Sequence, residues 1–229
     1  MIPRRRDLLA LVLLVALAGA ARAPRAAETD SFSEAERMLF TVDHFKTLKA
    51  PAQLDCEYRK RGTLEAEFTD KVRVAVAAKT PAGGHPVKVN FLSGKEHMQL
   101  PDLDNAEGNP LILYFLEREV REMNRVTGGS QNYYRKRIRI ALANSAEVKS
   151  VSLTIGGKAV QAREIHIAPY RDDPARSRYE KFAEKTFVLT LSEQVPGGVV
   201  EMRSELLEAA AGADPTLVVA ESVKYVARR

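Results

Sequence analysis

The chain has 229 residues, of which 45% are apolar and 28% are charged, so it can bury a core and is not a disordered protein. Its single cysteine, Cys56, excludes an internal disulfide and a zinc site built from several thiolates. The formal net charge of +5 is far below what a general nucleic-acid-binding protein concentrates, so we expect no nucleic-acid partner.

Residues 1–20 have the three-part form of an export signal. Three consecutive arginines precede an apolar stretch over residues 8–18, and small residues follow. We expect cleavage after Ala20 or Ala21, and removal of residues 1–20 lowers the formal net charge from +5 to +3. The apolar stretch is short for a membrane span, and no cysteine stands at the cleavage site. The sequence therefore predicts a periplasmic protein that is neither a lipoprotein nor held by a membrane span, and it leaves the general and twin-arginine export routes open.

Residues 21–32 have the composition of a flexible tether, and residues 33–229 are expected to form one domain. That domain begins with a short helix over residues 33–40. Runs of alternating apolar and polar residues follow at 54–58, 64–68, 72–76 and 87–91. A period of two with one polar face is typical of an antiparallel sheet that is covered on one side. We therefore expect a meander of strands with Cys56 on its buried face.

The segment over residues 110–143 has a helical pattern. Asn109 and Pro110 are a favourable helix start, and Gly128 ends the first helix, because glycine enters the left-handed conformation without strain. The apolar residues at helical spacing are Ile112, Leu116, Val120 and Met123. The charged residues spaced to pair on the opposite face are Glu117 with Arg121 and Arg118 with Glu122.

A second helix is expected from Ser130, as its N-cap, to Leu142. Its inward-facing residues are then Tyr134, Ile138, Ala141 and Leu142. A strand is the competing interpretation, because Ile138, Ile140 and Leu142 also alternate. The cap favours the helix.

Strand patterns return after residue 144. They lie at 151–155, 160–167, 187–191, 199–206 and 217–226. The sequence thus predicts an α+β fold of mainly antiparallel strands, with β-rich parts at 51–100 and 146–229. Both a sandwich and a curved half-barrel agree with this pattern, with the helical segment 110–143 packed on the sheet. In the half-barrel, that segment is placed to cover an apolar cavity as a lid.

The densest basic cluster lies around the start of the second helix. The free N–H groups of a helix N-terminus favour a bound carboxylate or phosphate, and nearby arginines add positive charge. The candidate anion-binding residues are Thr127, Gly129, Ser130, Arg135 and Arg139. The alternative is an ordinary solvated face, on which the arginines pair with glutamates of the preceding helix. Those glutamates are Glu117, Glu119 and Glu122.

No catalytic motif is present. The sequence contains neither G-x-S-x-G nor H-E-x-x-H, and its four histidines are scattered without metal-ligand spacing. We expect no metal and no cofactor. A periplasmic hydrolase is the competing hypothesis, with Arg135 or Arg139 holding an anionic substrate and His44 or His166 acting as the base.

Part of the sequence resembles an uncharacterised exported protein family of Gram-negative bacteria. The blocks that carry this resemblance are 108–110, 115–123, 127–129, 133–139, 169–170, 172–174 and 195–197. The resemblance implies an exported bacterial protein and assigns no activity, cofactor or site residue.

These observations favour a non-catalytic periplasmic binding protein that carries a lipid-like or anionic small ligand. An assembly or interaction factor that binds another envelope protein is the alternative partner class, and we expect no membrane span after signal cleavage.

Overall fold

The computed structural model describes residues 32–210 and 213–229. The predicted signal peptide at 1–20 and all but the last residue of the tether lie outside this part of the chain. Residues 32–229 form one compact unit. Its helices are α1 (Glu34–Phe40), α2 (Leu111–Thr127) and α3 (Gln131–Asn144). Its strands are β1 (Ala52–Arg61), β2 (Phe68–Val76), β3 (His85–Phe91), β4 (Leu103–Ala106), β5 (Glu147–Ile155), β6 (Lys158–Ile167), β7 (Thr186–Leu191), β8 (Val199–Ala210) and β9 (Ala213–Arg228).

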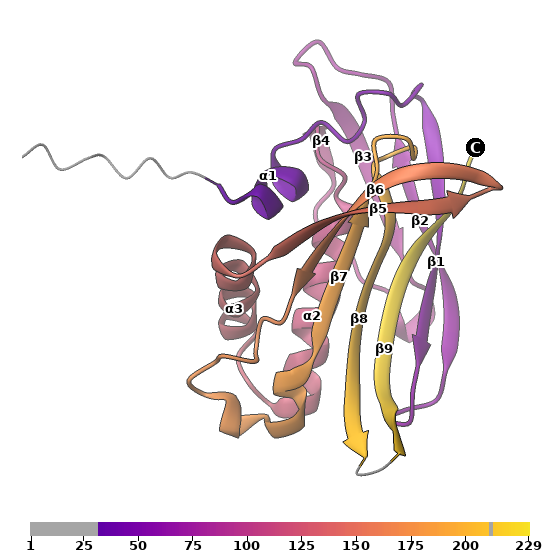
Figure 1. The fold of residues 1–229 in the computed structure, drawn as a ribbon. Helices are drawn as coiled ribbons and strands as arrows, with labels where there is room; N and C mark the ends of the chain where they lie inside the picture. Colours follow the sequence, from indigo (N-terminus) through magenta and orange to yellow (C-terminus); the bar gives the residue numbers. More distant parts are fainter. Residues whose placement is uncertain (1–31, 211–212) are drawn as a thin grey trace, which may run out of the picture. The chain divides into compact units, whose positions relative to one another are not determined.

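The strands form a single antiparallel sheet in the order β4-β3-β2-β1-β9-β8-β7-β6-β5. The sheet curves around α2, as Figure 1 shows. The fold is therefore the α+β half-barrel, and the sandwich is wrong. Strands β1 and β9 join the two β-rich parts of the sequence, and Tyr58 lies opposite Val223 at this join.

The alternation in β1 explains which face is buried. Leu54, Cys56 and Tyr58 point to the concave side and are at most 5% exposed, whereas Glu57 and Arg59, which alternate with them, are exposed. Cys56 is buried as predicted. Burial raises the pKa of its thiol to about 12.

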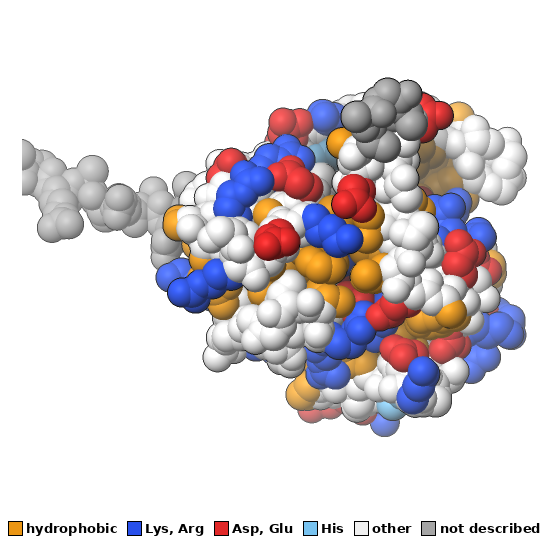
Figure 2. Space-filling model, turned by 90° about the horizontal axis from the view of Figure 1, so that it is seen from below, with side chains coloured by type: hydrophobic (Ala, Val, Ile, Leu, Met, Phe, Trp, Pro, Cys, Tyr) orange, Lys and Arg blue, Asp and Glu red, His pale blue; other side chains and the backbone are white. Residues whose placement is uncertain are grey.

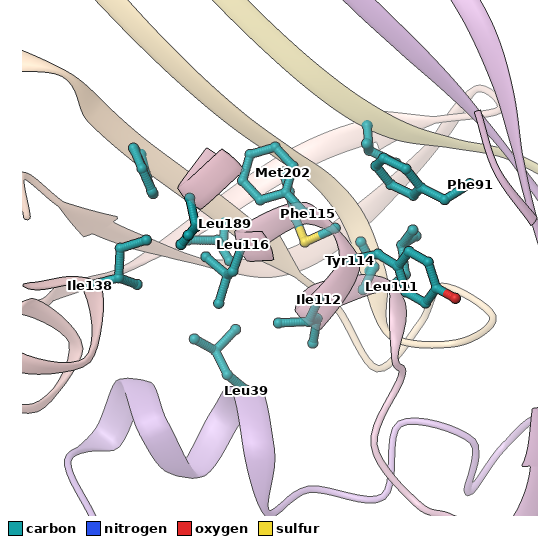
Figure 3. Close-up of a cluster of buried hydrophobic side chains, with 14 of the residues drawn as sticks. Leu39, Phe91, Leu111, Ile112, Tyr114, Phe115, Leu116, Ile138, Leu189 and Met202 are labelled. Carbon is teal, nitrogen blue, oxygen red and sulfur yellow. The ribbon is translucent and has the colours of Figure 1, made fainter. Parts of the chain in front are cut away.

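The predicted C-terminal end of α2 is confirmed, and its N-terminal end lies one residue later than predicted, with Pro110 rather than Asn109 at the N-cap position. The Oδ1 atom of Asn109 accepts the backbone N–H of Leu111 at 3.1 Å, and Gly128 has a φ of 72° at the C-terminal end. The predicted apolar stripe of this helix is buried. Figure 3 shows Phe115 and Leu116 of α2 packed among side chains of the sheet and of α3. The space beneath the predicted lid is thus filled, among the described residues, by the side chains of the helix itself.

The second helix is confirmed as α3, so the strand interpretation of this segment is wrong. Ser130 occupies the N-cap position, but its side chain makes no capping hydrogen bond. The four predicted inward-facing residues are buried.

Two strand boundaries differ from the sequence pattern. The predicted strand at 64–68 is a loop until Phe68, because Glu65 leaves the sheet and accepts a hydrogen bond from Lys60 at 2.6 Å. The acidic stretch after residue 101 forms the short edge strand β4. Its four residues are too few for a periodic signal.

Candidate functional site

A groove lies between α1 and the sheet. One wall is α1 with the loop that follows it, and the other wall comes from β5, β6 and the β7–β8 turn. Its volume is about 490 Å³, within the range of roughly 300–1,000 Å³ that is usual for small-molecule sites. The residues that line it are Glu34, Met38, Val42, Asp43, His44, Lys46, Thr47, Ser150, Gln161, Ala162, Arg163, Leu191, Ser192, Glu193, Gln194 and Gly198.

The floor of the groove continues the concave face of the sheet. Arg163 in β6 lies opposite Ser150 in β5 and Leu191 in β7. The next residue on the same face of β6 is Ile165, which is fully buried in the core. Arg163 is therefore a charged residue that stands next to the buried apolar positions of this face.

The α1 wall is fixed by its N-terminal cap. Ser33 and Glu36 form a reciprocal capping box, in which each side chain accepts the backbone N–H of the other residue. The Ser33 hydroxyl also donates to the carbonyl of Leu142 at the end of α3, at 2.8 Å. This anchoring places the half-buried Met38, together with Val42 beyond the helix, against the groove.

His44 connects this wall to α2. Its Nδ1 accepts the backbone N–H of Asn109 at 2.9 Å, so its Nε2 carries the proton and donates to the Met38 carbonyl at 2.8 Å. Burial lowers the pKa of His44, which favours this neutral form. A Cβ on Gly198 would lie 3.0 Å from the imidazole ring, so the β7–β8 turn packs closely on it. Both ring nitrogens are therefore engaged by the backbone, and neither is placed to act as a catalytic base.

Two ion pairs stand at the rim of the groove. Lys46 pairs with Glu193 at 2.8 Å, and Arg163 pairs with Glu34 through Nη2 at 2.5 Å. All four side chains are between 41% and 73% exposed, so each pair contributes little to stability, about 0–1 kcal/mol. The Nε of Arg163 is shielded from water and has no hydrogen-bond acceptor among the described residues.

The predicted anion-binding residues lie together around the turn between α2 and α3. Thr127 bonds to the Met123 carbonyl and to the Tyr134 hydroxyl, each at 2.5 Å. A Cβ on Gly129 would collide with that same hydroxyl, so the tyrosine covers the turn beside Ser130.

The two predicted arginines differ in their partners. Arg135 makes a two-pronged contact with Glu117, at 2.7 and 2.9 Å. Arg139 is exposed and makes no ion pair with any described residue. The surface ion pair expected for a solvated basic face is thus present between Arg135 and Glu117. Glu119 and Glu122 instead lie buried in the interior. The anion site at this turn stays a prediction.

The interior side of α2 carries a buried charged cluster. Lys60 of β1 contacts Glu65, Glu122 and Glu221 at 2.6, 3.0 and 3.4 Å. Arg118 contacts Glu221 at 3.2 Å rather than forming the predicted pair with Glu122. Although burial opposes the charge of Glu122, hydrogen bonds from Arg125 and Lys60 lower its pKa to about 2.

A separate ion pair lies deeper beneath the same helix. Lys185 donates to Glu119 at 2.5 Å, and Ser204 of β8 donates to the other carboxylate oxygen at 2.6 Å. All three residues are at most 1% exposed. The end of the molecule that contains α2's C-terminus is seen in Figure 2, where side chains of both charges lie interspersed with apolar ones.

The groove was not predicted from the sequence because its walls come from three distant segments, around residues 34–47, 150–163 and 191–198. One available signal was Arg163, a charged residue that directly precedes the inward-facing apolar positions Ile165 and Ile167 of β6. Among the described residues, no group of three or more His, Cys, Asp and Glu side chains could hold a metal. No described helix is long and apolar enough to cross a membrane.

The sequence matches no protein-family model and no curated protein. The chain shows a distant likeness to several solved structures. The lipoprotein LppX of Mycobacterium tuberculosis is 10% identical, with 84% of this chain and 91% of that chain covered and a TM-score of 0.33. LprF of Mycobacterium bovis is 13% identical, with 86% and 93% covered and a TM-score of 0.32. A LolA-superfamily protein of Nitrosomonas europaea is 10% identical, with 85% and 92% covered and a TM-score of 0.23. At TM-scores this low, the likeness assigns neither a ligand nor a family.

Proposed function

We propose that the protein is a non-catalytic periplasmic carrier that binds a lipid-like or anionic small molecule in the groove beside α1. The observation that carries this proposal is the hollow of about 490 Å³ at the end of the concave sheet face. Met38, Val42 and Leu191 give it an apolar lining, and charged side chains stand at its rim. An apolar lining with a few polar groups is the usual composition of a small-molecule site.

The surroundings of the reactive side chains support binding over catalysis. His44 lines the groove, but both of its ring nitrogens bond to the backbone. Cys56 is buried with a raised pKa, so its thiol carries almost no thiolate near neutral pH. A hydrolase would need a base or nucleophile that is free to reach its substrate.

The first test is native mass spectrometry of the protein from the periplasmic fraction. A carrier retains an adduct of a few hundred daltons that is lost on denaturation, and the same spectrum gives the mature N-terminus. A ligand that dissociates during purification is sought by titrating the purified protein with laurate, whose alkyl chain suits an apolar lining.

Val42→Trp tests whether the groove is the binding site. The indole would fill the space beside Met38, so we expect laurate affinity to fall roughly tenfold or more. Val226→Trp is the matched control, because Val226 is 62% exposed and does not line the groove. Equal laurate affinity in both variants would place the ligand elsewhere, and the absence of any adduct and of laurate binding would contradict the carrier.

A further inference from the structure

We propose that Arg163 is the head-group subsite of the groove and binds the carboxylate or phosphate of an amphipathic ligand in place of Glu34. This inference rests on the proposed carrier function and specifies its ligand class. The ligand would lay its alkyl part along Met38 and Val42 and present two anionic oxygens to the guanidinium.

The first support is the unused donor of Arg163. Its Nη2 donates to Glu34 at 2.5 Å, whereas its Nε is buried and finds no acceptor in the part of the chain that the structure describes. Nε and one terminal nitrogen form one edge of the planar guanidinium, and a carboxylate or phosphate can accept from both at once. Glu34 uses only half of this edge, and a buried donor without a partner is unfavourable.

The second support is the position of the arginine in the sheet. Arg163 stands in the cross-strand row with Ser150 and Leu191, on the face that is apolar one step further along β6. Its side chain therefore rises from the floor of the groove. A ligand lying on this floor meets the guanidinium before it reaches the core residue Ile165.

The third support is that Glu34 is a replaceable partner. It lies in the first turn of α1 and its side chain is 51% exposed, so water can take its place at the arginine. An exposed ion pair of this kind changes an equilibrium constant by less than roughly fivefold. A ligand that accepts from both nitrogens of Arg163 and also buries an alkyl chain should therefore bind the arginine more favourably than Glu34 does.

The experiment compares three probes with the same alkyl chain: laurate, lauryl phosphate and lauryl alcohol. For the wild-type protein we expect both anions to bind more tightly than the alcohol. Arg163→Gln should lower the affinity for the anions roughly tenfold to a hundredfold and leave the affinity for the alcohol unchanged. Arg163→Lys keeps the charge but loses the planar edge, so it should restore only part of the anion affinity.

Two further variants make the test specific. Glu34→Gln removes the competing carboxylate, so laurate affinity should rise by up to roughly fivefold. Lys46→Gln is the matched control, because it removes a positive charge from the same rim without touching Arg163. It should change anion affinity much less than Arg163→Gln does. Circular dichroism and thermal unfolding confirm that each variant is folded.

The outcomes separate the subsite from the carrier. If lauryl alcohol binds as tightly as laurate, and Arg163→Gln changes neither, the subsite is wrong while the carrier stands. If no probe binds the wild-type protein, the carrier fails. A loss confined to laurate or to lauryl phosphate supports the subsite and identifies the head group as a carboxylate or a phosphate.

Discussion

The two halves of α2 differ in chemistry where they meet the sheet, because the second half adds buried charged side chains to the apolar stripe that Val120 and Met123 continue. The apolar half, residues 111–116, packs Ile112 and Phe115 into the main core, whereas the charged half, residues 118–125, packs charged side chains against β1, β8 and β9. Apolar packing depends on total volume and shape and tolerates small changes. A buried charge depends on particular partners, and it becomes strongly unfavourable when one of them is lost. The charged half therefore fixes the position of α2 more narrowly than the apolar half does.

The largest expected effect of a substitution is at Lys185. Lys185→Met leaves Glu119 fully buried without its cation, so we expect a loss of about 3–5 kcal/mol in the free energy of unfolding. Urea denaturation measures the loss. The double variant with Glu119→Leu removes both charges and should recover most of it. A single variant within about 1 kcal/mol of wild type would show that the pair does not behave as a buried charge pair.

The next largest expected effect is a loss of folding stability at low pH, which comes from Glu122. The folded protein holds the pKa of Glu122 at about 2, below the ordinary value of 4.5, so the unfolded chain takes up the proton first as the pH falls. Its contribution is fully present above pH 4.5 and is lost between pH 4.5 and 2. The size of this contribution is about 3 kcal/mol.

Unfolding free energies of wild type and Glu122→Gln across this range measure the contribution of Glu122. Other carboxylates titrate in both proteins, so the difference between the two curves is the relevant quantity. We expect the wild-type curve to fall more steeply on acidification. Parallel curves would mean that the Lys60 and Arg125 contacts do not stabilise the charged form.

The smallest effect is expected in the apolar half. Ile112→Val removes one methylene from a position that is 1% exposed, so we expect a loss of about 1 kcal/mol, measured by the same urea titration. A loss as large as that of Lys185→Met would contradict the contrast between the two halves.

Local signals in the sequence predicted the helices and most strands. Asn109 and Gly128 marked the ends of α2, because such end signals depend on neighbouring residues alone. Ser130 marked the start of α3 by its position, although its side chain makes no capping hydrogen bond. The charged half was not predicted, because Arg118 and Glu122 have the spacing of a surface pair. Only the folded sheet brings Glu221 of β9 close enough to turn Arg118 inwards.

The candidate site was harder to predict than the fold. The predicted anion site combined Thr127, Gly129 and Ser130 because they stand at a helix N-terminus, which is a local feature of the chain. The groove depends on α1 approaching β6. The hydrophobic periodicity of the sequence does not indicate that Glu34 and Arg163, which are 129 residues apart, are in contact. Only the charge at Arg163, beside the apolar positions Ile165 and Ile167 of the same strand, was visible beforehand.

The pairing of β1 with β9 has a consequence for how the protein is made. The first strand of the sheet lies beside the last, and the Tyr58 hydroxyl donates to Glu221 at 2.6 Å across 163 residues. Until the final strand has been synthesised, β1 has an open edge, and Lys60 lacks one of its three carboxylate contacts. Closing so distant a contact is entropically slow. The sheet is therefore completed only after β9 has left the ribosome, so β1 to β8 wait for the strand that joins the two parts of the sheet.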